Sequence, residues 1–128
     1  MDKLEKIREI ELRIAEIQQE REKQHLFMLE NPSYIDSVNI TQTELKEELE
    51  ELKTKKYNLV FGWAMLTFNG NSQTSKDVQE NMWNVYFDRY DTEIRKVLAD
   101  ARHCGYLDSI DGTYRITDEG KQRFSDKN

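Results

Sequence analysis

Residues 91–124, DTEIRKVLADARHCGYLDSIDGTYRITDEGKQRF, hold the local signals that decide the fold of the C-terminal half. Apolar side chains recur here at the three- and four-residue spacing of a helix with one buried face: Ile94, Val97, Leu98, Ala101 and Cys104. Gly105 suits the left-handed conformation that ends a helix, and Asp111-Gly112 is a hairpin-turn signal. Thr117 is the expected N-cap of another helix. The segment therefore predicts a helix over about 91–104, a two-stranded hairpin and the start of a further helix.

The sequence upstream continues this pattern of short helices. We expect a helix over 58–68 and, after Asn69-Gly70-Asn71, a second helix that begins with a Thr74–Asp77 capping box and reaches about Tyr86. Its expected buried stripe is Val78, Met82 and Val85. Asp91 is the expected N-cap of the helix that follows. Aromatic residues of this half recur at helical spacing, which predicts core packing and not a base-stacking platform.

The order of helix, Gly-Tyr-Leu, hairpin and YRITDEGKQRF resembles the C-terminal half of a winged-helix DNA-binding domain of the MarR and PadR type. The resemblance covers about a quarter of the chain. In those families the helix before Gly-Tyr-Leu enters DNA, and a phrase such as Tyr-x-Ile-Thr-x-x-Gly closes the wing. The resemblance implies a winged helix-turn-helix domain over 58–128 that contacts duplex DNA through the helix at about 91–104. Two departures are a long second helix and turn, and no evident short strand before that helix.

The N-terminal half predicts a long helical hairpin over residues 1–57. Residues 2–30 contain no Gly or Pro, and isoleucines repeat at a 3-4-3 spacing typical of a coiled-coil seam, which turns polar at Arg21 and Gln24. Asn31-Pro32 should end this helix, and Thr41 with Glu44 should begin the next after a loop over 31–40. The expected seam of the second helix is Leu45, Leu49, Leu52, Lys56, Leu59, Trp63 and Leu66.

Two interpretations of this seam remain open. It could pack the hairpin on itself, or it could be a dimerisation arm that joins two chains in a homodimer. The residues that would form the dimer interface are Ile7, Ile10, Ile14, Ile17, Leu45, Leu49 and Leu52. The expected fold is thus mainly α: an antiparallel helical hairpin or coiled coil, followed by a winged helix-turn-helix domain with a short β-hairpin wing.

Composition excludes several classes of function. Hydrophobic residues make up 37% of the chain and charged residues 34%, as expected for long solvated helices. One cysteine allows no intrachain disulfide, and no apolar run is long enough to span a membrane. Metal-ligand, phosphate-loop and nucleophile motifs are absent, so we expect no cofactor, no metal and no enzyme activity. The expected location is the cytoplasm, with no membrane partner.

Candidate DNA-contacting residues lie opposite the apolar stripe of the helix over 91–104 and on the returning strand. They are Thr92, Arg95, Lys96, Arg102, His103 and Arg115. Arg95 and Lys96 are the best candidates for base or phosphate contact, since Arg binds guanine in bidentate fashion. The wing tip opposes this reading, because it carries Asp108 and Asp111 and no cation. Cys104 is expected to be a small buried residue of the same helix.

Two functions follow. The first is a small dimeric DNA-binding regulator whose two recognition helices read half-sites on double-stranded DNA. The net charge of −6 opposes it: residues 1–57 carry 10 Lys/Arg and 14 Asp/Glu, and residues 58–128 carry 9 and 11, so neither part is basic. The alternative is a protein-binding adaptor or inhibitor, of the kind that phages and plasmids encode, which docks through the coiled coil and the winged helix.

Overall fold

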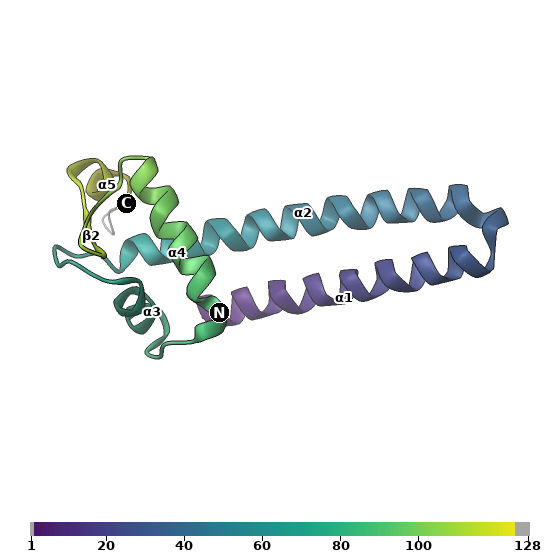
Figure 1. Cartoon of the computed structure of the whole chain (residues 1–128), viewed down its shortest axis with the longest axis horizontal. Helices are drawn as coiled ribbons and strands as arrows, with labels where there is room; N and C mark the ends of the chain where they lie inside the picture. Colours follow the sequence, from purple (N-terminus) through teal and green to yellow (C-terminus); the bar gives the residue numbers. More distant parts are fainter. Residues whose placement is uncertain (1, 125–128) are drawn as a thin grey trace. The chain divides into compact units, whose positions relative to one another are not determined.

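The computed structural model describes residues 2–124. It is mainly helical, with one small antiparallel sheet (Figure 1). The chain divides into two compact units between Tyr57 and Asn58. The first unit is a helical hairpin, and the second combines short helices with the sheet.

Helix α1 spans Lys3–Glu30. The side chain of Asp2 caps its start by accepting a hydrogen bond from the Leu4 amide at 3.2 Å. The helix ends at Asn31, whose amide and side chain both donate to the Phe27 carbonyl, at 2.9 and 3.0 Å. Pro32 follows directly and cannot continue the helix, so the predicted stop at Asn31-Pro32 is confirmed.

Helix α2 begins six residues earlier than predicted. A single 3-10 turn, η1 (Pro32–Tyr34), leads straight into α2, which spans Ile35–Leu66. The predicted loop over 31–40 and the capping box at Thr41 are therefore wrong. The hydroxyl of Thr41 instead donates to the Ser37 carbonyl at 3.2 Å, one turn back inside the helix. Val38 is buried, and its packing outweighs the weak helix propensity of residues 35–40.

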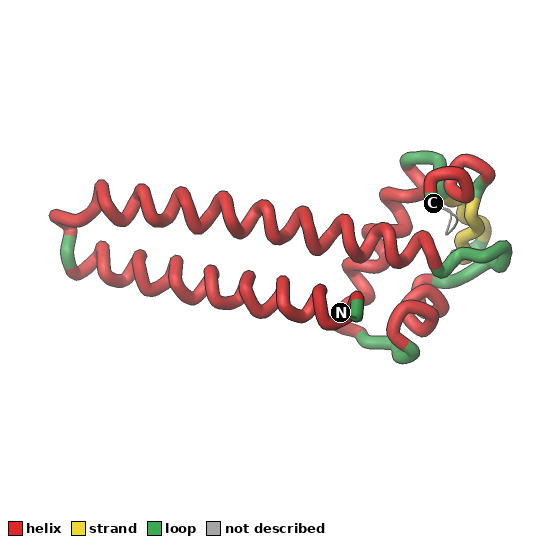
Figure 2. The backbone as a smooth tube through the Cα atoms, turned by 180° about the vertical axis from the view of Figure 1, so that it is seen from behind, coloured by secondary structure: helices red, strands yellow, loops and turns green. Residues whose placement is uncertain are grey.

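In the first unit α1 and the 35–57 part of α2 run antiparallel, side by side (Figures 1 and 2). Arg13 forms an ion pair with Glu48 at 2.9 Å, and Lys56 forms one with Glu11 at 3.4 Å. Burial confirms the predicted seam positions in α1 and in residues 45–56 of α2. Its buried positions are Ile7, Ile10, Ile17, Val38 and Leu49, and its half-buried positions are Ile14, Arg21, Gln24, Met28, Leu45, Leu52 and Lys56.

Beyond Tyr57 the predicted seam holds only in part. Leu59 and Trp63 are half-buried, but Leu66 is exposed, and the buried positions are Val60, Ala64 and Met65. A helix with 3.6 residues per turn drifts relative to a strict seven-residue repeat, so a new face becomes apolar. This face belongs to the core of the second unit.

The second unit continues with α3 (Ser75–Trp83), α4 (Asp88–His103), β1 (Leu107–Ile110), β2 (Thr113–Ile116) and α5 (Asp118–Arg123). The Thr74–Asp77 capping box of α3 is confirmed, with both reciprocal hydrogen bonds present at 3.0 and 3.2 Å. Helix α3 ends at Trp83 and not near Tyr86, because Asn84 takes the left-handed conformation with φ of 67°. Val85 therefore lies outside the helix and is exposed, contrary to the prediction.

Helix α4 starts at Asp88, three residues before the predicted N-cap at Asp91. Phe87 is the N-cap and offers no side-chain hydrogen bond there. Tyr90 is buried and its ring packs 5.1 Å from that of Trp83, so hydrophobic packing extends the first turn where polar capping alone would not. The aromatic residues of this unit pack as predicted, in a group around Trp83 and a second group formed by Phe61, Tyr106 and Phe124.

The end of α4 and the β-hairpin follow the local signals of the sequence. The amides of Gly105 and Tyr106 donate to the carbonyls of Arg102 and Ala101, the two hydrogen bonds of a Schellman motif, and Gly105 has φ of 86°. Asp111 and Gly112 both have positive φ and join β1 to β2 as a two-residue turn. Figure 2 shows these strands in yellow.

Thr117 caps α5 as predicted, accepting from the Gly120 amide at 3.1 Å. Gly120 itself is buried against the backbone of Tyr106, and a Cβ at this position would collide with the Tyr106 carbonyl oxygen and with Ile116. By contrast, a Cβ on Gly62 in α2 would meet nothing within 4 Å. Position 120 therefore requires the absence of a side chain, whereas position 62 has room for one.

We expect Gly120→Ala to lower the free energy of unfolding by about 1–3 kcal/mol, because the backbone of α5 must move away from Tyr106. Gly62→Ala is the matched control, and it should raise stability by up to about 1 kcal/mol through helix propensity. Urea unfolding followed by circular dichroism measures both. Equal stability of Gly120→Ala and wild type would contradict the close contact.

Candidate interaction surfaces

The residues predicted to contact DNA all lie on the surface of the second unit. Helix α4 buries Ile94, Val97, Leu98 and Ala101 and turns its opposite side to solvent. The exposed predicted residues are Thr92, Arg95, Lys96, Arg102 and His103 on α4, and Arg115 on β2. The predicted orientation of α4 is thus confirmed, and what the exposed side can bind depends on its charges.

Arg95 is paired within its own helix. Its Nε lies 2.7 Å from Oδ2 of Asp91, one turn earlier. This hydrogen bond is the main cause of the raised pKa of Arg95. Lys96 is also exposed, and it too has an interaction partner within the chain.

Acidic residues gather at the start of α4, where the helix dipole favours them. Partial desolvation, followed by the carboxylates of Asp91 and Asp88, raises the pKa of the neighbouring Tyr86 phenol. Over its whole length α4 carries four acidic residues and four Lys/Arg, so its net charge is zero. These acids offset part of the attraction that the cations would have for an approaching phosphate backbone.

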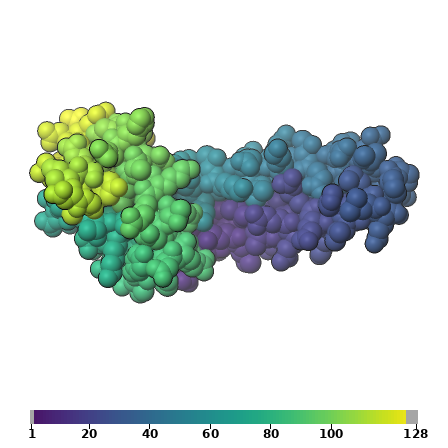
Figure 3. All heavy atoms as spheres, in the orientation of Figure 1, coloured from purple at the N-terminus to yellow at the C-terminus, as the bar shows by residue number. Residues whose placement is uncertain are grey.

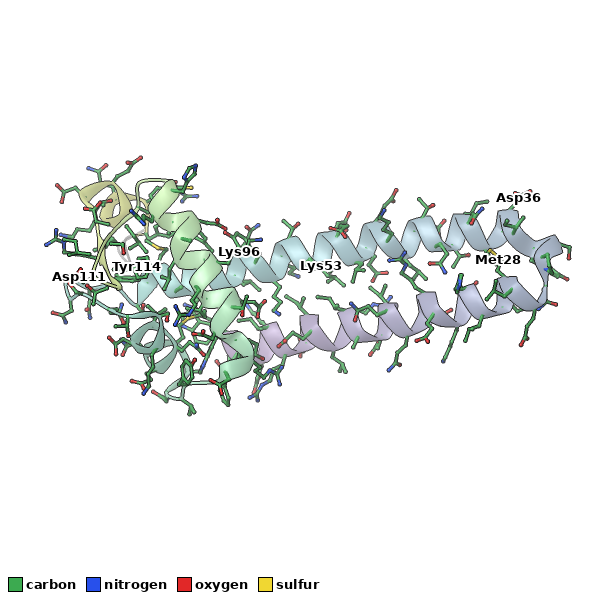
Figure 4. All side chains as sticks on the ribbon, viewed as in Figure 1. Met28, Asp36, Lys53, Lys96, Asp111 and Tyr114 are labelled. Carbon is green, nitrogen blue, oxygen red and sulfur yellow. The ribbon has the colours of Figure 1, made fainter. Side chains whose placement is uncertain are left out.

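The β1–β2 hairpin also carries charges of both signs. Asp108 on β1 lies directly opposite Arg115 on β2 in the register of the sheet. At the turn, labelled at Asp111 in Figure 4, the chain presents an exposed isoleucine, Ile110, beside the acidic Asp111. The β1–β2 turn is therefore both apolar and acidic, and its acidic character is the one that the sequence indicated.

Cys104 is exposed, and the prediction that it is buried was wrong. The apolar stripe of α4 stops at Ala101, because Cys104 is the C-cap and Gly105 then turns the chain. Within residues 2–124, no group of three or more His, Cys, Asp or Glu side chains is arranged to hold a metal ion.

The residues predicted to form a dimer interface lie in the seam of the hairpin. Ile17 and Leu49 are buried, and Ile14, Leu45 and Leu52 are half-buried. Polar contacts tie the two helices together along this seam: Arg21 donates to the Gln42 side chain at 3.0 Å, and Gln42 donates back to the Arg21 carbonyl at 2.8 Å. The structure thus uses the seam to pack the hairpin on itself.

Sequence reasoning missed the apolar surface at the turn of the hairpin. We call residues 24–43 the hairpin tip. Six large apolar side chains of the tip are 45–63% exposed: Leu26, Phe27, Leu29, Tyr34, Ile35 and Ile40. The sequence does contain a signal for this exposed surface, the stretch LFMLENPSYIDSVNI. Eight of its fifteen residues are apolar, but only Met28 and Val38 fall on the seam.

The hairpin tip also contains a recess of about 400 Å³ between the two helices. Its lining combines the apolar Met28 and Val38 with the charged and polar side chains of Arg21, Glu22, His25, Asn39 and Gln42. Figure 4 shows Met28 directed toward the space between α1 and α2, and Asp36 on the outer side of α2. In Figure 3 the tip is the dark blue end of the hairpin.

Comparison with known proteins gave no relative: no family model, no curated protein and no solved structure matches this chain. In the part of the chain that the structure describes, none of the helices has the length and apolar character needed to cross a membrane.

The exposure of Cys104 predicts that its thiol reacts in the folded protein. With a water-soluble aromatic disulfide reagent, we expect the folded chain to react within about tenfold of the rate measured in denaturing urea, because a thiol that is exposed needs no unfolding. Stopped-flow absorbance measures both rates. Reaction that waits for global unfolding would mean that Cys104 is covered.

Proposed function

We propose that this chain is a non-enzymatic protein-binding adaptor whose second unit docks on a protein partner through α4 and the β1–β2 turn. The observation that carries this proposal is the charge balance of that surface. Arg95 is held by Asp91 at 2.7 Å, and Arg115 stands opposite Asp108. Affinity for nucleic acid comes mainly from cations that replace the counterions of phosphates, and here the cations are offset by acids.

The same surface has the composition of a protein interface. Interfaces between proteins join apolar anchors to a polar rim of both charge signs. Ile110 at the turn is 63% exposed and would be such an anchor. The mixed charges of α4 would form the rim, where they add specificity more than affinity.

A DNA-binding regulator is the second candidate, and one observation favours it. Helices α3 and α4 are followed by a β-hairpin, and a bridge of two hydrogen bonds joins Gln73 to Tyr114, at 2.8 and 2.7 Å. This bridge lies before α3, where the winged-helix families that the sequence resembles have a short strand. The order of elements thus favours DNA, and the charges favour protein.

Binding to a fluorescent mixed-sequence duplex of 30 base pairs separates the two candidates. We expect no saturable binding of wild type below roughly 100 μM at 150 mM salt, the weak limit for non-specific DNA binding. Replacing three acids (Asp91→Asn, Asp108→Asn and Asp111→Asn) should release the cations and create measurable, salt-dependent binding. Fluorescence anisotropy over 50–300 mM salt gives the affinity and its salt dependence.

A micromolar or tighter affinity of wild type would instead support the DNA regulator, provided that Arg95→Ala with Lys96→Ala reduces the salt dependence. The matched control is Lys6→Ala with Arg8→Ala, which removes the same charge from the exposed side of α1. If this control lost as much DNA affinity as the Arg95→Ala and Lys96→Ala variant, binding would depend on the net charge of the chain and not on α4.

A photo-crosslinking amino acid at position 110 or 99 tests the protein partner directly. In the cells that produce the chain, we expect crosslinks to protein from these positions, because both lie on the proposed surface. The same residue at position 5, which is exposed on α1, serves as the control. Crosslinks to DNA alone would contradict the proposal.

A further inference from the structure

We propose that Asn69 is a site of spontaneous deamidation, at which the backbone amide of Gly70 attacks the Asn69 side chain and a new carboxylate is left on the connection between α2 and α3. This connection covers residues 67–74. The inference is independent of the docking surface proposed above, because it concerns a different segment of the second unit and needs no partner protein.

The reaction consumes only water, and it is one reason why asparagine is a thermolabile residue. The Gly70 nitrogen loses its proton to hydroxide, and its electron pair attacks the side-chain carbonyl carbon of Asn69, so that a new C–N bond closes a succinimide ring. The bond from that carbon to Nδ2 breaks, and the nitrogen takes a proton from water and leaves as ammonia. Water then opens the ring at either carbonyl, which gives aspartate or isoaspartate with one added negative charge.

The backbone of this connection requires a glycine directly after Asn69. Gly70 has φ of 99°, a conformation that residues with a side chain adopt only under strain. A Cβ at position 70 would meet nothing within 4 Å, so the backbone angle selects glycine and a lack of space does not. Glycine is also the residue that shields its own nitrogen least, because it has no Cβ beside the attacking atom. The turn therefore needs the same residue that favours the attack.

Neither reacting group is held by another interaction. Asn69 and Gly70 are both exposed, and within the described residues the Asn69 side chain and the Gly70 amide form no hydrogen bond with the protein. The connection is anchored on either side of them: the Phe68 amide donates back into α2 at 3.2 Å, and Gln73 exchanges two hydrogen bonds with Tyr114, at 2.8 and 2.7 Å. The ring can therefore close without breaking a hydrogen bond of the fold.

The structure protects most of the other asparagines within residues 2–124. In three of them the following amide donates to the helix backbone one turn earlier, and these are Asn39, Asn58 and Asn81. Asn31 precedes Pro32, whose nitrogen has no proton to lose. Asn84 precedes Val85, whose branched side chain crowds the nitrogen that would attack.

Asn71 is the internal comparison, since it is exposed in the same connection two residues further on. It differs from Asn69 in its neighbour, because the attacking nitrogen would be that of Ser72. A side chain on the attacking residue crowds its nitrogen and restricts its backbone angles. We therefore expect Asn69 to react at least about tenfold faster than Asn71.

The new carboxylate would lie among acids of the second unit. Asn69 and Asn71 line a recess of about 190 Å³ together with Asp77 and Glu80. Asp77 already accepts a hydrogen bond from the Thr74 amide in the capping box of α3, so its carboxylate is fixed beside the recess. Residues 58–128 carry 9 Lys/Arg and 11 Asp/Glu, so deamidation changes their net charge from −2 to −3. The product is therefore separable by its charge.

Incubation of the full chain at pH 7.4 and 37 °C for four weeks tests the proposal. Anion exchange separates the more acidic product, and peptide mapping by mass spectrometry locates the modified residue. We expect the product at Asn69 first. Incubation in 8 M urea should change the rate at Asn69 by less than about threefold, because the folded chain leaves this site open, whereas the asparagines inside helices should react faster once unfolded.

Two matched variants assign the acidic product to one residue. Asn69→Gln should abolish it, because glutamine must close a larger ring, and Asn71→Gln should leave its rate unchanged. The opposite pattern in these variants would overturn the proposal, and so would a folded chain in which Asn69 reacts no faster than Asn71 or reacts only in urea. None of these results changes the DNA-binding or crosslinking measurements, so the two proposals fail separately.

Discussion

The burial of the isoleucine seam within a single hairpin is the constraint on which the interaction surfaces of this chain depend. Ile17 and Leu49 are covered by the hairpin, and ion pairs and amide contacts hold α1 against α2 on both sides of them. If the seam instead bound another chain, Ile17 and Leu49 would be exposed in the monomer, and the hairpin tip would be less important as a contact surface. Because the seam is used internally, contact with other molecules falls to the side chains that the hairpin and the second unit leave exposed.

Two such surfaces result, and they differ in chemistry. The tip is apolar and poor in charge, whereas the exposed side of α4 and the β1–β2 turn carry balanced charges around one apolar residue. The order of helices and strands in the second unit does not decide what it binds, because the ligand of a fold is set by its surface and not by its topology. The Arg95–Asp91 pair illustrates this point, since the same arginine without its acidic neighbour would be a plausible phosphate contact.

The parts of the fold that were predictable from sequence are those set by local chemistry. Gly105, Asp111-Gly112, Thr117 and the Thr74–Asp77 capping box each act within a few residues, and each performs its predicted role. The errors occurred where tertiary packing outweighed local signals: Val38 extends α2 backward to Ile35, and Tyr90 extends α4 back to Asp88. At the candidate sites, helical periodicity correctly predicted which side of α4 is exposed to solvent. The pairing of Arg95 with Asp91 depends on rotamers, however, and the exposure of the tip depends on where the turn is made, so neither followed from the pattern.

Hydrogen exchange of the hairpin amides as a function of protein concentration tests most directly whether the seam closes within one chain. If it does, amides of residues 7–21 stay protected at 1 μM as they are at 100 μM, because each chain covers its own seam. If protection of these amides falls with dilution, the seam is completed by a second chain, and the assignment of the interaction surfaces to the tip and α4 would be wrong.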